Sequence, residues 1–272
     1  MTVLYRWLSI TVYSVHAISL RRALLCLTLL MCLPAGADEI HIAVAANFLG
    51  TLQQLAPLFA QDTGNQLVIS SGSSGQLYTQ IKQGAPFDVF LSADSERPKQ
   101  LESEALGVAG SRITYAIGTL VLWSPQPGVV DAGGKILLKG AFRILAVADP
   151  KNAPYGTAAQ QVLTALGVWD SLNQNHKIAT AENINQAWQF AATGNAQLAF
   201  IAKSQLSAPA GSAGGAGSSW EPPQSMYTEI DQDGIVLTRT EKRAAAEAFM
   251  QWLHHNARST AAITAAGYRI KE

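Results

Sequence analysis

The sequence predicts an α/β protein with parallel strands, folded as two lobes. Apolar runs typical of strands alternate with helical patterns along most of the chain, as in sheets built from strand–helix–strand units. The region that follows an amino-terminal leader, residues 38–272, is also long for one doubly wound sheet and suits two lobes.

The first 37 residues have the pattern of a signal peptide. Arg21 and Arg22 precede the apolar run ALLCLTLLMCLP, which ends at the small-x-small triplet AGA. The run is too short to span a bilayer comfortably, so an uncleaved anchor is the lesser alternative. We expect cleavage after Ala37 and export of a soluble protein. Cleavage would remove both cysteines, Cys26 and Cys32, and leave no disulfide or thiolate site.

Charge and composition argue against several classes of function. The leader holds three of the 19 Lys and Arg residues and none of the 19 Asp and Glu residues, so the mature net charge would be −3. That balance does not favour nucleic acid or an anionic membrane surface as a partner. No nucleophile-elbow, zinc-protease, phosphate-loop or dinucleotide-binding motif occurs. The remaining histidines are not spaced as metal ligands: His41, His176, His254 and His255.

The elements of the first half follow from apolar periodicity. A strand over 40–46 breaks at Asn47, and Phe48, Leu52, Leu55 and Phe59 then recur at helical spacing. Further along we expect a strand over 66–70, a helix over 74–83, a strand over 87–91 and a passage between lobes over 113–123.

The second half repeats the alternation. The pattern predicts strands over 142–147, 197–202 and 234–237, and helices over 157–166 and 184–192, the latter capped by Asn183. Thr240 is expected to cap a late helix, and a last short helix should end near Ala265. The low-complexity stretch SAPAGSAGGAGSS, residues 207–219, is assigned no structure.

Two strand-to-helix turns are the most informative part of the chain: VAANF, with Asn47, and SSGSSG, with Ser73 and Ser74. Unpaired N–H groups and a partial positive charge let a helix start receive an anion, and Ser and Asn add side-chain donors. No Lys or Arg occurs between Arg22 and Lys82, so neutral dipoles would hold it. Alone, the SSGSSG turn is equally well explained as an ordinary helix cap, and an Asn in the position of Asn47 is most often a cap.

Four such turns should face one cleft, because ligands of open α/β sheets bind beyond the carboxyl ends of the strands. They lie at Asn47, at Ser73 with Ser74, at Tyr155, and at Asn183 with Ile184. The competing interpretation is structural, with Tyr155 a half-buried aromatic, Ile184 a core residue and Asp149 bracing its own turn.

The combination of motifs is more specific than any one of them. VAANF, GSSGQL followed by GAPFDVFLSAD, ADPKNAPYG, LGVWD and the ENI turn closely resemble the periplasmic molybdate-binding proteins of ABC transporters, from about Glu39 to the final AAGYRI. The resemblance implies a two-lobed type II periplasmic binding protein, each lobe a mostly parallel sheet flanked by helices, with the ligand in the interlobe cleft. It implies a signal peptide over 1–37, lobe 1 from 38–115 with 230–272, and lobe 2 from 116–229.

The resemblance also implies a binding site for a tetrahedral oxyanion. Some relatives have Ser at the position of Asn47, a small residue at Tyr155, and a ligand-binding Tyr after the strand that ends here at Ala202. This chain resembles the branch with Asn in the first turn and Tyr before Gly, so Ala202 is left out. Carried over residue by residue, the site falls on Asn47, Ser74, Tyr155 and Ile184 (through its backbone N–H), with Ala46 and Ser73 as additional members.

The implied function is transport without catalysis. The resemblance implies a periplasmic, monomeric receptor that binds molybdate, and tungstate as well, and delivers it to the membrane permease. It implies no catalytic residue, no cofactor, and no metal apart from the molybdenum of the oxyanion.

Three other functions compete with this one. A sulfate-type receptor would share the fold. A hydrolase using Ser73 or Ser74 as nucleophile would need a histidine base, and none lies near in a recognisable pattern. The effector domain of a regulator would lack the signal peptide and would carry a DNA-binding segment.

Overall fold

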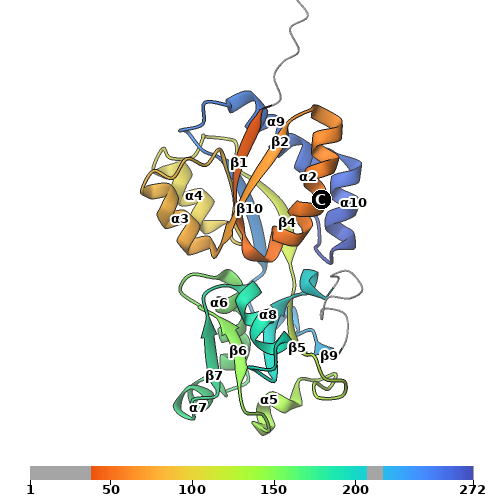
Figure 1. Cartoon of the computed structure of the whole chain (residues 1–272). Coiled ribbons are helices and arrows are strands. Elements are labelled where there is room, and N and C mark those ends of the chain that lie inside the picture. Colours follow the sequence, from red (N-terminus) through yellow and green to blue (C-terminus); the bar gives the residue numbers. More distant parts are fainter. Residues whose placement is uncertain (1–37, 207–216, 272) are drawn as a thin grey trace, which may run out of the picture. The chain divides into compact units, whose positions relative to one another are not determined.

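The computed structural model describes residues 38–206 and 217–271; the expected signal peptide and residues 207–216 lie outside them. Two five-stranded sheets, each with helices on both faces, make up this part of the chain and confirm the predicted two-lobed α/β fold (Figure 1). We call the elements around the sheet that contains β1 lobe 1, and those around the other sheet lobe 2.

The sheet of lobe 1 is mixed. Ile42 of its first strand pairs in parallel with Ile69 on one side and Val89 on the other, whereas the last strand of the chain runs antiparallel to its neighbours. In spatial order the strands are β2 (Gln66–Gly72), β1 (Glu39–Ala45), β3 (Val89–Leu91), β10 (Ile230–Val236) and β4 (Ile113–Gly118).

Two groups of helices cover the faces of this sheet. One face packs the predicted stripe of Leu52, Leu55 and Phe59 together with Phe249, and the other packs Leu77. The first group is η1 (Ala46–Phe48), α2 (Leu49–Thr63), α9 (Arg243–His255) and α10 (Ala257–Ala265); the second is α3 (Ser74–Lys82) and α4 (Glu96–Ser103).

Lobe 2 repeats this plan. Helix α6 (Pro154–Ala165) packs on one face of its sheet and α8 (Ile184–Ala192) on the other. Its strands, in spatial order, are β7 (Ile178–Ala181), β6 (Leu145–Ala148), β8 (Leu198–Ala202), β5 (Leu120–Ser124) and β9 (Ser218–Trp220). The remaining short helices are α5 (Lys135–Lys139), α7 (Trp169–Gln174), η2 (Lys203–Gln205) and η3 (Gln224–Met226).

The chain crosses between the lobes twice, at Thr119 between β4 and β5, and again between β9 and β10. The expected lobe limits stay a prediction, although β4 continues past residue 115 to Gly118 within the sheet of lobe 1. No helix among the described residues is long and apolar enough to cross a membrane.

Several predicted elements differ from the observed ones. The strand expected over 234–237 starts at Ile230, because its polar residues are buried among distant partners. Thr240 does not cap α9; its hydroxyl donates to Asp88 Oδ1 at 2.6 Å and accepts from the Lys242 N–H at 3.0 Å, which forms a turn before the helix. The stretch given no structure ends in β9, which pairs antiparallel with β5.

Candidate functional site

A small cavity lies where the helix starts of the two lobes meet. Lobe 1 contributes the end of β1 with η1, the start of α3 and the residue that follows β3, and lobe 2 contributes the starts of α6 and α8. Every lining side chain is uncharged, as the sequence predicted. The lining residues are Ala45, Ala46, Asn47, Ser73, Ser74, Ala93, Ala153, Pro154, Tyr155, Asn183 and Ile184.

All six residues predicted from the sequence therefore lie around one cavity, whereas Ala202 is buried at the end of β8 and does not line it. Parallel strands explain this convergence. The carboxyl ends of β1, β2 and β3 lie together at one end of the lobe 1 sheet, and those of β6 and β7 lie together at one end of the lobe 2 sheet. The sequence argument missed the small residues Ala93 and Ala153, which have no chemical signature of their own.

The start of α3 gives its two serines different roles. Ser73 is the N-cap: its Oγ lies 3.4 Å from the Gln76 N–H and 2.9 Å from Gln76 Oε1, so the hydroxyl is used within the turn. Ser74 Oγ accepts a hydrogen bond from the Ala93 N–H at 3.0 Å. Among the described residues no acceptor takes the Ser74 proton, so Ser74 can donate into the cavity.

Asn47 offers the cavity its backbone rather than its amide group. Both protons of Nδ2 are committed, to Gln232 Oε1 at 2.8 Å and to the Tyr268 hydroxyl at 3.1 Å. The backbone N–H of Asn47 lies in the first turn of η1, where helical N–H groups have no partner within the helix. Asn47 is thus both a lining residue and a brace for the turn.

The contribution of lobe 2 comes from two helix starts. The side chain of Asn183 caps α8 by accepting from the N–H groups of Asn185 and Gln186 at 3.0 and 3.1 Å, as predicted. This cap leaves the first N–H of the helix, that of Ile184, without a partner in the helix. Asp149 braces the turn before α6, accepting from the Lys151 N–H at 3.0 Å and from Asn152 Nδ2 at 2.8 Å.

Tyr155 lies in the first turn of α6, not in the loop before it as the sequence suggested. Its side chain is 2% exposed, and its hydroxyl oxygen accepts a hydrogen bond from Gln232 Nε2 at 3.1 Å. Burial, and after it the neighbouring Tyr268 and Tyr115, raises the pKa of Tyr155 well above its ordinary value. The hydroxyl therefore keeps its proton and can act as a donor.

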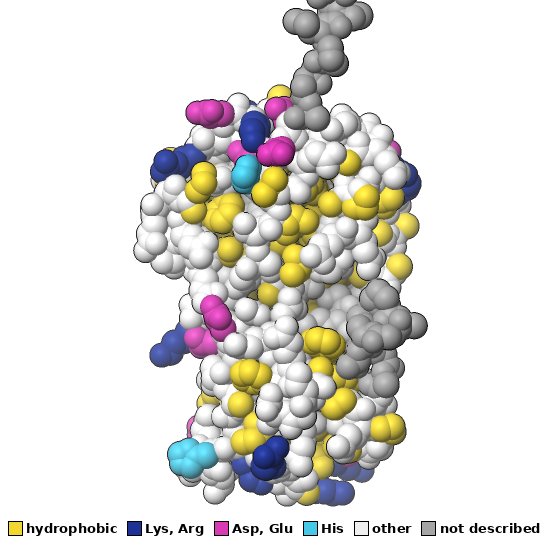
Figure 2. Space-filling view, viewed as in Figure 1, with side chains coloured by type: hydrophobic (Ala, Val, Ile, Leu, Met, Phe, Trp, Pro, Cys, Tyr) yellow, Lys and Arg dark blue, Asp and Glu magenta, His cyan; other side chains and the backbone are white. Residues whose placement is uncertain are grey.

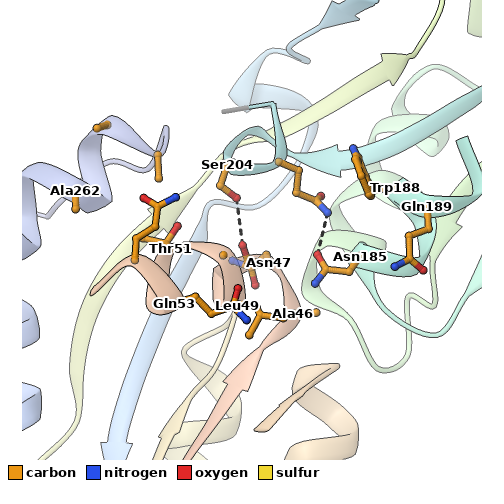
Figure 3. Close-up of a pocket in the computed structure, with 15 residues that line it drawn as sticks. Ala46, Asn47, Leu49, Thr51, Gln53, Asn185, Trp188, Gln189, Ser204 and Ala262 are labelled. Atoms are coloured by element: carbon orange, nitrogen blue, oxygen red, sulfur yellow. Dashed lines mark hydrogen bonds between the residues drawn. The ribbon is translucent and has the colours of Figure 1, made fainter. Parts of the chain in front are cut away.

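A larger pocket adjoins the cavity and shares Ala46 and Asn47 with it (Figure 3). There Ser204 of η2 reaches across from lobe 2, and its hydroxyl donates to the backbone oxygen of Asn47 at 3.2 Å (Figure 3). Tyr268 donates to the same oxygen at 2.7 Å. The Ser204 contact joins the two lobes beside the cavity, whereas the Tyr268 contact lies within lobe 1.

Positive charge is not concentrated at the site. On the face drawn in Figure 2, Lys and Arg side chains lie mostly toward the two ends and the margins. Arg97, which lies across the lobe boundary from Lys151, is paired with Asp94 and does not line the cavity. Among the described residues no group of three or more His, Cys, Asp or Glu side chains could hold a metal ion. The cavity can therefore hold an anion only through neutral hydrogen-bond donors.

Residues 40–269 match the family described as bacterial extracellular solute-binding protein. The chain belongs to this family. One relative of this solute-binding protein, the molybdate-binding protein ModA of Azotobacter vinelandii, is 45% identical over 242 residues, covering 89% of this chain and 94% of the relative. The molybdate-binding protein ModA of Rhodobacter capsulatus is 47% identical over 229 residues, covering 84% and 88%.

The fold of this solute-binding protein also matches a solved structure. The periplasmic molybdate-binding protein of Azotobacter vinelandii superimposes with a TM-score of 0.82 at 45% sequence identity, covering 86% of this chain and 100% of that one. The resemblance inferred from the motifs and the type II two-lobed fold are both confirmed, and the relatives are binding proteins.

Proposed function

We propose that this protein is the periplasmic receptor of an ABC importer, that it binds molybdate between its lobes, and that it delivers the anion to a membrane permease. The observation that carries the proposal is the cavity at which uncharged helix starts from both lobes meet. The two molybdate-binding relatives at 45% and 47% identity support the choice of anion.

The proposed ligand set is one of donors only. Ser74 and Tyr155 would donate their hydroxyl protons, and Asn47 and Ile184 their backbone N–H groups. Molybdate is fully deprotonated at neutral pH, so its four oxygens accept and none donates. A donor-lined site penalises protonated phosphate, because the phosphate O–H would be buried without an acceptor.

Size must separate molybdate from sulfate, which is also a dianion. The smaller sulfate would leave some donors beyond hydrogen-bond distance. Tungstate, which matches molybdate in size and charge, should bind as well.

The rest of the proposal concerns export, oligomeric state, delivery to the permease and the absence of catalysis. We infer that the protein is exported by a signal peptide over residues 1–37, acts as a monomer and releases the anion to a permease; the family and the leader pattern support this inference. We infer no catalysis, because a serine nucleophile needs a base and no histidine lines the cavity beside Ser73 or Ser74.

Isothermal titration of the mature protein with molybdate, tungstate, sulfate and phosphate tests the proposal. Molybdate and tungstate should bind with similar affinity, and both far more tightly than sulfate or phosphate. A preference for sulfate would replace the proposal with a sulfate receptor, and binding of none of the four would overturn it. Turnover of a generic ester by the purified protein would contradict the absence of catalysis.

A further inference from the structure

Gln232 lies behind the cavity rather than in it. Its side chain is completely buried in β10, the strand by which the chain returns to lobe 1. The amide oxygen accepts from Asn47 Nδ2 at 2.8 Å and lies 3.1 Å from the Tyr115 hydroxyl, whose single proton is shared with the Ser92 backbone oxygen at 2.9 Å. This surrounding orients the amide, so that its nitrogen faces the other lobe.

The nitrogen of that amide fixes the direction of a proton in lobe 2. Gln232 Nε2 donates to the hydroxyl oxygen of Tyr155 at 3.1 Å. A tyrosine hydroxyl has one proton, and it cannot point at a group that is itself donating. The Tyr155 proton is therefore turned away from Gln232, and Tyr155 lines the cavity.

The close approach depends on a glycine in β4, the strand that pairs with β10. A Cβ atom on Gly118, at the end of β4, would lie 2.1 Å from the Tyr155 hydroxyl oxygen and 2.6 Å from Gln232 Nε2. Any side chain at this position would push the two groups apart. The two strands of lobe 1 that lead into and out of lobe 2 thus both take part in placing this one hydroxyl.

We propose that Gln232 is a positioning residue that makes Tyr155 an obligate hydrogen-bond donor to the bound oxyanion, so that the site selects fully deprotonated anions. The inference rests on the proposed function and names the group behind its selectivity. Since Gln232 belongs to lobe 1 and Tyr155 to lobe 2, the donor is set correctly only when the lobes meet as in this structure.

A double-mutant cycle with molybdate tests the coupling. Gln232→Met keeps an unbranched side chain of similar length and removes both the Nε2 donor and the Oε1 acceptor of Asn47. The loss through Asn47 should be the same in both backgrounds, so Gln232→Met should weaken molybdate binding about 3- to 10-fold more in the wild-type background than in the Tyr155→Phe background, where no proton remains to be oriented. Ser204→Ala is the matched control, because it also removes a contact between the lobes but does not touch Tyr155. Its effect should be the same in both backgrounds.

A second variant reverses the hydrogen bond. In Gln232→Glu a carboxylate replaces the donor and accepts a hydrogen bond from the Tyr155 hydroxyl. The Tyr155 oxygen then presents its lone pairs, an acceptor, to the cavity. The ratio of molybdate to phosphate affinity should then fall at least tenfold, by about the worth of one hydrogen bond to a charged group. It should recover in part as the pH falls and the new carboxyl regains a proton. If Gln232 had a purely structural role, the substitution would weaken the binding of molybdate and phosphate equally and leave the ratio of their affinities unchanged.

Circular dichroism and the melting temperature of each ligand-free variant establish that it folds. If Gln232→Met does not fold, Gly118→Ala replaces it in the cycle, since it separates the same two groups. Equal losses with and without the Tyr155 hydroxyl, or an unchanged affinity ratio in Gln232→Glu, would overturn the inference. Failure of the wild-type protein to bind molybdate would instead overturn the proposed function.

Discussion

Gly75 and Asn152 face each other across the boundary between the lobes: the backbone N–H of Gly75 donates to the backbone oxygen of Asn152 at 2.9 Å. A Cβ atom on Gly75 would lie 2.8 Å from Asn152 Oδ1 and 3.0 Å from Asn152 Cα. The first turn of α3 can therefore meet lobe 2 this closely only because residue 75 has no side chain.

Gly75→Ala should oppose closure of the lobes without harming lobe 1. Alanine is the better helix former by about 1 kcal/mol, so the melting temperature of the ligand-free protein should hold or rise. Molybdate affinity should fall about tenfold or more, because closure would cost on the order of 1–3 kcal/mol of crowding. Thermal melting measures the stability, titration the affinity, and small-angle scattering the closure of the lobes. The wild type should compact on adding molybdate, and the variant should need far more ligand. Unchanged affinity would show that this contact is not needed for binding.

Tyr155→Phe tests the donor from lobe 2. A hydrogen bond to a charged group contributes roughly 1.5–3 kcal/mol, so molybdate binding should weaken about 10- to 150-fold. Stability should also fall, because Gln232 Nε2 loses its acceptor inside the protein. Ile184→Val is the control; it keeps the backbone N–H and should bind almost normally. Near-normal affinity in Tyr155→Phe would remove Tyr155 from the ligand set.

Ser74→Ala tests the donor from lobe 1. The loss of affinity should be comparable to that of Tyr155→Phe, since one hydroxyl donor is removed in each case. The Ala93 N–H also loses its partner, so the melting temperature should fall as well. Ser73→Ala should instead act mainly on stability, because the Ser73 hydroxyl is used to cap α3. Titration and thermal melting of the two variants, side by side, separate binding from capping.

Salt provides a test that needs no mutation. Between about 0.01 M and about 0.15 M salt the screening length falls from about 30 Å to about 8 Å. A site of short bonds to uncharged donors should lose less than about threefold in molybdate affinity over this range. Titrations at several chloride concentrations measure it. A steep loss would reveal a Lys or Arg that holds the anion.

Stability should fall at alkaline pH. Burial raises the pKa of Tyr268 from 10.0 to about 12, and it raises the pKa values of Tyr115 and Tyr155 well above normal. Below about pH 10 these tyrosines are protonated in both states and cost nothing. Above it the unfolded chain loses its protons first, so the free energy of unfolding falls. For Tyr268 the loss is about 2–3 kcal/mol by about pH 12. Urea unfolding across this range measures it, and Tyr268→Phe should show a smaller fall.

Local chemistry explains why much of the site could be predicted from the sequence. The caps at Ser73 and Asn183 are formed with residues two or three positions away, so a short stretch of sequence is enough to predict each cap. Thr240 shows where this reasoning fails. Its hydroxyl accepts from the Lys242 N–H, which closes a turn before the helix, and donates to Asp88, a residue far away in the sequence.

Strand β10 was read too short for a similar reason. Its segment IDQDGIV carries three polar residues, which a sequence argument places in a loop. In the structure Gln232 and Asp233 are buried because partners far along the chain satisfy them, with Asp233 held by Arg112 and by Thr114 at 2.6 and 2.7 Å. Such partners belong to the tertiary fold.

The sequence by itself determined that uncharged, donor-rich helix starts follow successive strands, because the strand–helix alternation, the caps and the absence of Lys and Arg between Arg22 and Lys82 are all local features. Only the tertiary structure decided which donors are free to serve a ligand. The side-chain amide of Asn47 donates to Gln232, 185 residues away, and the same Gln232 orients the hydroxyl of Tyr155. A hydroxyl or amide proton points where its partners leave room, and those partners come together only when the two lobes fold and meet.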